Sequence, residues 1–134
     1  MLAKWVAAVV VAMAAPGQAQ EVNCASAGTQ NEMTFCAEQD WVAADAGLNA
    51  IYQQALAVLQ QIDADLPKAD RVGANFLRQA QRDWVSFRDN ACAAEGWPVQ
   101  GGSAEPMVIY ACRARLTRER SAGLGHIAGH GNEN

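Results

Sequence analysis

Residues 79–92 constrain the fold most, because they combine a helical apolar pattern with a cysteine. Apolar side chains around this stretch recur at steps of three and four, the spacing of one face of an α-helix, at Leu77, Ala80, Trp84, Phe87 and Ala91. Arg88 and Cys92 border this stripe. An apolar face, a cation and a thiol on one helix each need a partner on a neighbouring segment. We therefore expect a central packed helix, with Trp84 and Phe87 in the core.

Residues 1–19 have the pattern of a secretory signal peptide. Lys4 supplies a positive start, residues 5–15 are an apolar run too short to span a bilayer comfortably, and Gly17 and Ala19 form a small-x-small cleavage site. We expect the mature chain to begin at Gln20, with no membrane insertion after signal cleavage. No lipid-attachment motif surrounds Cys24, so a lipid anchor is not expected.

The chain has four cysteines, Cys24, Cys36, Cys92 and Cys112. Export places them in an oxidising compartment, where an even number indicates disulfides. A helical rise of about 1.5 Å per residue gives the position of each cysteine along the axis of an up-down-up bundle. Cysteines at the same level along this axis are Cys24 with Cys92 and Cys36 with Cys112, so these pairs are favoured. The pairs Cys24–Cys36 and Cys92–Cys112 are the main alternative, since four cysteines allow several connectivities.

Helix start and stop signals divide the rest of the chain into three helices. Thr29 and Glu32 have capping-box spacing, which predicts a first helix that starts there and runs without proline to about residue 62. Pro67 excludes one continuous helix, so residues 63–73 form a connection and a second helix covers about residues 74–94. Residues 96–103 form a Gly-rich loop, and Ser103 is expected to cap a third helix over about residues 104–122.

The predicted fold is all-α, because no strand pattern is present: a small antiparallel three-helix bundle over residues 20–124, stapled by two disulfides. Residues 125–134 are rich in glycine and are expected to form a flexible C-terminal tail. The same helix heights predict two ion pairs, Glu32 with Arg88 and Asp45 with Arg120. Partly buried pairs of this kind fix helix register more than they add stability.

The charge balance disfavours nucleic acid as a partner. The chain has 10 basic and 14 acidic residues, and loss of Lys4 with the signal peptide would leave 9 basic residues and a formal net charge of −5. Carboxylates at helical spacing, such as Asp40 with Asp45 or Asp83 with Asp89, are the groups that glycoside hydrolysis requires. Helical surfaces carry such residues routinely, so we interpret them as solvated or structural.

Two further pairs of side chains would suggest a catalytic site or a metal site. Ser103 with His126 would be a nucleophile and a base, and His126 with His130 would be a zinc-binding pair on a helix. Helix capping by Ser103 and a flexible tail around the histidines are the preferred interpretations. We therefore expect no catalytic, cofactor or metal site, and the protein is predicted not to be an enzyme.

Several short motifs stand together in one order along the chain. They are Glu32-Met33-x-x-Cys36-Ala37, Asp45-x-x-Leu48-Asn49-x-x-Tyr52, Gln81-Arg82-x-Trp84-x-x-Phe87-Arg88-x-x-x-Cys92, Gly101-Gly102-Ser103 and Cys112-x-x-x-Leu116-Thr117-x-x-Arg120. In this order, and with an export signal, the sequence resembles the LprI-type lysozyme-inhibitor family over residues 24–124. The resemblance implies a small exported helical domain, periplasmic or secreted. The name-giving member is a lipoprotein, whereas this sequence lacks the lipid-attachment motif.

The resemblance also implies a function, because the name-giving member inhibits lysozyme. The partner would be a protein, and a lysozyme of the chicken type is the candidate. Its contacts would lie in or beside the loop at residues 96–107. Candidate partner-binding residues are Glu95, Trp97, Ser103 and Glu105. Trp is enriched at interface hot spots, although Trp97 alternatively covers the end of the bundle. The alternative function is an envelope interaction or scaffold module with another protein partner, and the oligomeric state stays open.

Overall fold

The computed structural model describes residues 21–132, and the expected signal peptide at residues 1–19 lies outside them. Three long helices dominate: α1 (Gln30–Ala64), α2 (Gly73–Gly96) and α3 (Glu105–Gly129). Short 3-10 turns flank them, namely η1 (Cys24–Ser26), η2 (Lys68–Asp70), η3 (Trp97–Val99) and η4 (His130–Asn132). No strand occurs between residues 21 and 132. The predicted all-α three-helix bundle is confirmed.

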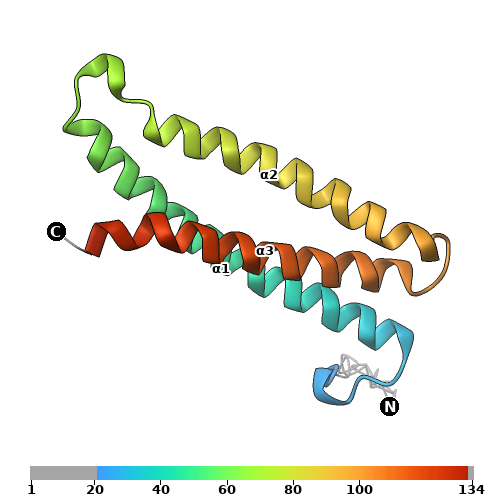
Figure 1. Ribbon diagram of the computed structural model, residues 1–134. Helices are drawn as coiled ribbons and strands as arrows, with labels where there is room; N and C mark the ends of the chain where they lie inside the picture. The colour runs from blue at the N-terminus through green and yellow to red at the C-terminus, as the bar shows by residue number, and fades with distance from the viewer. Residues whose placement is uncertain (1–20, 133–134) are drawn as a thin grey trace, which may run out of the picture.

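The helices run up, down and up again (Figure 1). α2 is antiparallel to the other two, and α3 lies against α1, the most extensive contact between helices in the structure. Within the described residues, no helix combines the length and the apolar character needed to cross a bilayer.

The start of α1 is the predicted capping box. The Glu32 backbone N–H donates to Thr29 Oγ1 (3.3 Å), and the Thr29 backbone N–H donates to Glu32 Oε2 (3.0 Å). The Gly28 backbone N–H donates to the same carboxylate oxygen (3.0 Å). These backbone hydrogen bonds, from Thr29 first and then Gly28, lower the pKa of Glu32 because they favour its charged form. Glu32 therefore serves the end of its own helix.

The connection between α1 and α2 covers residues 65–72 and is held by two reciprocal side chains. Asp63 in the last turn of α1 accepts hydrogen bonds from the backbone N–H groups of Gly73 (3.0 Å) and Ala74 (2.9 Å). Arg71 donates to the backbone carbonyls of Leu66 (2.9 Å) and Ala64 (3.2 Å). Each helix end thus finds partners for groups that the helix itself leaves unsatisfied.

The third helix differs from its prediction at both ends. Its N-cap is Ala104 rather than Ser103, and no side chain caps it. Instead, the Glu105 carboxylate accepts a hydrogen bond from the Gly101 backbone N–H (2.7 Å), so the first turn of α3 binds back onto the loop. α3 also continues to Gly129, so the boundary of the expected flexible tail falls inside a helix. The reason is packing: Leu124 is fully buried and the residues after it also contact the core.

The core joins all three helices through Leu48, Ala55, Leu77 and Leu124. Trp84 packs against it, but the prediction that Phe87 is a core residue is wrong, because its side chain is 59% exposed. The buried stripe of α2 shares Leu77 with the apolar one but differs from it in the second half of the helix. It consists of Ala74, Leu77, Arg88, Cys92 and Gly96. Arg88 therefore occupies the inward position that apolar character alone had assigned to Phe87.

Candidate functional site

The two disulfides are Cys24–Cys36 and Cys92–Cys112, with Cα atoms 5.5 Å apart in each. The favoured prediction of Cys24–Cys92 and Cys36–Cys112 is wrong, and the alternative pairing is the one observed. Cys24 lies in η1, directly before α1, and pairs with Cys36 in the second turn of α1. Cys92 near the end of α2 pairs with Cys112 of α3, so the second disulfide joins two helices and the first stays within the N-terminal part of the chain.

The ion pairs in the structure differ from both predicted pairs. Arg88 Nη1 lies 3.3 Å from Asp45 Oδ1, and Arg88 Nη2 lies 3.0 Å from Asp89 Oδ1. The predicted pairs Glu32–Arg88 and Asp45–Arg120 are therefore wrong, because Asp45 is the residue of α1 level with Arg88. Arg120 Nε instead donates to Gln81 Oε1 (3.0 Å).

A cation–aromatic cluster forms around Arg88, whose side chain is only 8% exposed. Its guanidinium carbon lies 5.5 Å from the ring centre of Trp41 and 5.2 Å from that of Trp84. Arg113 covers Trp41 at 4.8 Å, and Trp41 stacks on Tyr110 with ring centres 5.7 Å apart. Contacts of this kind contribute about 0.5–2 kcal/mol each. The cluster contains residues of α1, α2 and α3, and its contacts stabilise the relative positions of the three helices in the C-terminal half of α2.

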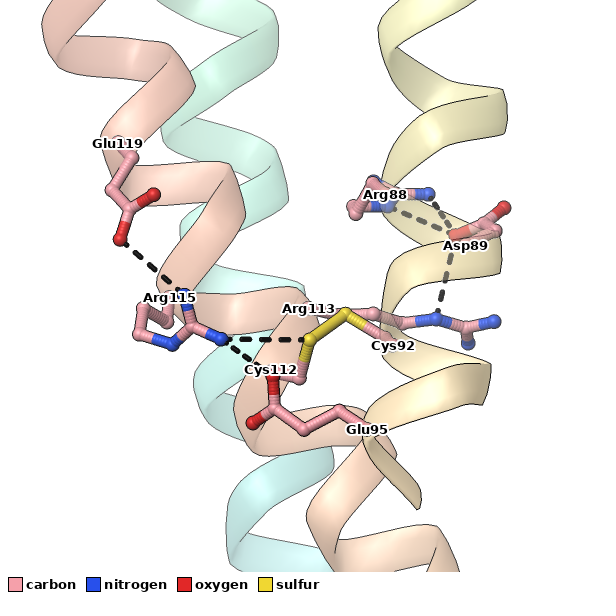
Figure 2. The surroundings of a disulfide bond; sticks show 8 residues. All are labelled: Arg88, Asp89, Cys92, Glu95, Cys112, Arg113, Arg115 and Glu119. Atoms are coloured by element: carbon pink, nitrogen blue, oxygen red, sulfur yellow. Dashed lines mark hydrogen bonds and ion pairs between the residues drawn. A yellow bond between two sulfur atoms is a disulfide. The ribbon is translucent and has the colours of Figure 1, made fainter. Parts of the chain in front are cut away.

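Figure 2 shows Arg88 and Arg113 of this cluster beside the Cys92–Cys112 disulfide. Asp89 Oδ1 lies between the two arginines, 3.0 Å from Arg88 Nη2 and 3.4 Å from Arg113 Nε. Cys92 is on the next turn of α2, and both its side chain and that of Cys112 are buried. Sequence reasoning missed Trp41, Tyr110 and Arg113 as members of the cluster. The available signal was Arg88 four residues after Trp84, which places both on one helical face.

The predicted partner-binding residues lie around the loop between α2 and α3, residues 97–104, which we call the α2–α3 loop. Glu95 precedes the loop, and its carboxylate lies 2.7 Å from Arg115 Nη2 of α3. Arg115 also lies 3.5 Å from Glu119 (Figure 2). Glu105 follows the loop and binds the Gly101 backbone N–H. Both carboxylates are therefore engaged within the protein and brace the two ends of the loop.

The base of the α2–α3 loop is tightly packed. A Cβ atom added at Gly96 would lie 2.8 Å from Ile109 Cγ1, so only glycine allows this approach of α2 to α3. Gly101 adopts a φ of 74°, a left-handed conformation that glycine tolerates without strain. Above this base, Trp97 is 64% exposed, and Ser103 is also exposed. The structure thus brings the four predicted residues to one end of the bundle, with Trp97 as its prominent apolar group.

The residues considered as catalytic candidates have structural partners or lie far apart. Asp40 pairs with Arg118, and Asp83 accepts a hydrogen bond from Gln79 (2.8 Å). Ser103 precedes α3 and His126 lies in its last turn, which separates them by roughly 30 Å at the rise of an α-helix. Between residues 21 and 132, no group of three or more His, Cys, Asp or Glu side chains is placed to hold a metal ion.

The fold and its surface define a class: a small helical bundle with two disulfides and a braced loop that exposes a tryptophan. The family model "Lysozyme inhibitor LprI" matches residues 22–124, and the chain belongs to this family. The family is named for inhibitors rather than for enzymes, and its name implies a protein partner. The family and the disulfides together suggest a periplasmic or extracellular protein.

Two curated relatives carry no assigned function. An uncharacterized protein of Rhizobium meliloti (strain 1021) is 41% identical over 118 residues, which cover 84% of this chain and 85% of the relative. The uncharacterized protein YecT of Escherichia coli (strain K12) is 33% identical over 63 residues, 46% of this chain and 39% of that protein. No solved structure matches significantly.

Proposed function

We propose that this protein is an exported inhibitor of lysozyme, periplasmic or secreted, and that it binds the enzyme through the α2–α3 loop without catalytic activity of its own. Membership of the LprI family supports lysozyme as the target. The observation that carries the binding surface is Trp97, 64% exposed at the start of a loop whose two ends are braced.

The bracing matters because association costs free energy for every side chain and loop that must be ordered. The buried Cys92–Cys112 disulfide, the Gly96–Ile109 contact and the Glu105–Gly101 hydrogen bond hold the loop before any partner arrives. A tryptophan on such a base is the kind of residue that dominates interface energetics. A rigid projection of this shape is suited to enter an enzyme cleft.

The four predicted contact residues divide into two roles in this proposal. Trp97 and Ser103 touch the enzyme, whereas Glu95 and Glu105 hold the loop through Arg115 and the Gly101 backbone. The formal net charge of the exported chain, −5 after the loss of Lys4, would accelerate association with a basic enzyme such as a chicken-type lysozyme. The association rate constant should therefore fall as the salt concentration rises.

A turbidity assay of cell-wall lysis tests the proposal. The oxidised protein, beginning at Gln20, is titrated into a chicken-type lysozyme beside Trp97→Ala and the control Phe76→Ala. Phe76 is 69% exposed, but it lies at the other end of α2. Trp97→Ala should raise the half-inhibitory concentration about 30-fold or more, since a hot-spot residue contributes about 2 kcal/mol. Phe76→Ala should leave inhibition unchanged, and circular dichroism should show equal helicity in all three proteins.

Two outcomes contradict the proposal. Equal inhibition by Trp97→Ala and the unmutated protein would place the binding surface elsewhere. Lack of inhibition by the folded, unmutated protein at large molar excess would remove chicken-type lysozyme as the target. The alternative, an envelope scaffold module with another protein partner, would then be favoured, because it needs the same helices, disulfides and exposed loop.

A further inference from the structure

A groove of about 360 Å³ lies between the middle of α1 and the first half of α2. Its lining, which we call the arginine groove, comprises Asn49, Tyr52, Gln53, Arg78, Gln81, Arg82 and Val85. On each helix the lining residues follow one another within one turn, at i, i+3 and i+4, so each set lies on one helical face. The volume is within the range of small-molecule sites in proteins, about 300–1,000 Å³.

The groove is positively charged in an acidic protein. Arg78 and Arg82 line it, and no Asp or Glu does. Arg78 donates to the Asn75 side chain (3.0 Å) and Arg82 to the Gln79 side chain (2.6 Å), both neutral partners. Among the other described arginines, Arg71 and Arg120 also bind neutral groups. Carboxylates pair with the remaining four, Arg88, Arg113, Arg115 and Arg118.

The position of the two arginines is unfavourable without an anion. They stand four residues apart on α2, where two like charges on a helix repel each other. None of the acidic residues that the structure describes lines the groove to relieve this repulsion. A bound carboxylate would relieve it, and the guanidinium group is the side chain best shaped to hold a carboxylate through paired hydrogen bonds.

The rest of the lining suits a polyhydroxylated molecule. The amides of Asn49, Gln53 and Gln81 carry both donors and acceptors, as hydroxyl groups require. Asn49 Nδ2 donates to Asp45 Oδ2 (3.4 Å), which leaves its carbonyl oxygen and second N–H for a ligand. Gln81 Oε1 already accepts from Arg120, which orients that amide and leaves its NH₂ group as the available donor. Tyr52 packs against the core and lines the groove, so its ring, together with Val85, offers an apolar surface to the C–H face of a sugar ring.

We propose that the arginine groove binds a carboxylated saccharide, with Arg78 and Arg82 on the carboxylate and the three amides on the hydroxyl groups. This site is separate from the α2–α3 loop: Arg82 precedes Trp97 on α2 by 15 positions, roughly 20 Å along the helix. The proposal does not depend on lysozyme inhibition. Trp97→Ala should leave saccharide binding unchanged.

The test is a titration of the isotope-labelled, oxidised protein with D-glucuronate, followed by nuclear magnetic resonance. D-glucose and acetate serve as the neutral-sugar and simple-anion probes. Glucuronate should give saturable shifts at the groove residues, and both other probes should bind about tenfold more weakly. Arg82→Gln should weaken glucuronate binding about tenfold, because a charge-assisted hydrogen bond contributes about 1.5–3 kcal/mol.

Arg118→Gln is the matched control, since it removes one positive charge whose partner, Asp40, lies outside the groove. It should leave the affinity for glucuronate unchanged. The proposal is overturned if glucuronate causes no saturable shifts at the groove. It is equally overturned if glucose or acetate binds as tightly as glucuronate, or if Arg118→Gln weakens binding as much as Arg82→Gln. Circular dichroism of both variants should match that of the unmutated protein.

Discussion

The two connections between helices turn the chain by different physical means. At the α1–α2 connection, a carboxylate and a guanidinium group satisfy free backbone groups. Asp63 accepts from the first N–H groups of α2, and Arg71 donates to the carbonyls of Ala64, the last residue of α1, and of Leu66 in the connection. At the α2–α3 loop, a buried disulfide and the close Gly96–Ile109 contact hold the two helices together directly. The first solution stabilises helix ends, whereas the second fixes the distance between helices.

This difference determines how firmly each end of the bundle holds the side chains that it exposes to a partner. Hydrogen-bonded caps in contact with water exchange readily with solvent, so the connection they hold opens with little free-energy cost. A loop anchored by a buried disulfide keeps its base in place while its tip remains exposed. Trp97 stands on the anchored loop. The comparison therefore predicts that substitutions at the α2–α3 end alter global stability most, and that substitutions at the α1–α2 end act on one helix terminus.

The largest effect is expected on removal of Cys92–Cys112 by the double substitution Cys92→Ala with Cys112→Ala. The free energy of unfolding should fall by about 3 kcal/mol, because the disulfide closes a loop across two helices that the folded state must hold together. Urea unfolding followed by circular dichroism measures the change.

The control for this substitution is Cys24→Ala with Cys36→Ala. That disulfide ties η1, which contains no buried residue, to α1. Without it the N-terminal segment can detach while the bundle stays folded, so the loss should be below about 1 kcal/mol. Equal losses for the two double variants would contradict the comparison.

The next effect is expected from Asp63→Ala at the α1–α2 connection. The substitution leaves the backbone N–H groups of Gly73 and Ala74 without their shared acceptor, and loss of such a cap costs about 1–2 kcal/mol. Asp65→Ala removes the same charge two residues further on and should change stability by less than about 0.5 kcal/mol. Hydrogen exchange of the first turn of α2 should accelerate in Asp63→Ala alone. Equal exchange in the two variants would show that the carboxylate does not hold this end.

The smallest effects come from two glycines, and they should differ in sign. Gly96→Ala brings a Cβ atom to within 2.8 Å of Ile109 Cγ1, and the crowding should cost about 1 kcal/mol. Gly47→Ala on α1 meets no atom within 4 Å, so the gain in helix propensity should raise stability by about 0.5–1 kcal/mol. Thermal unfolding of the two variants measures both. A stabilising Gly96→Ala would show that the base of the α2–α3 loop is loosely packed.

Local signals in the sequence predicted much of the fold and part of the candidate site. The Thr29–Glu32 capping box marked the start of α1, because both partners lie within one turn of chain. The glycine-rich stretch beside Cys92 located the α2–α3 loop and its exposed Trp97. The arginine groove was not predictable, because its two halves come from different helices and their alignment depends on how α1 and α2 pack.

By itself, the sequence determined the helices, their order and the family, because apolar period, caps and motifs act over short distances along the chain. The tertiary structure alone decided which residues meet. The packing of the helices selected Cys24–Cys36 and Cys92–Cys112 over the pairing that matching heights favoured, and it placed Arg88 against Asp45 rather than Glu32. It also buried Arg88 and left Phe87 exposed. Register and rotation depend on the packing of whole helices, which no local pattern specifies.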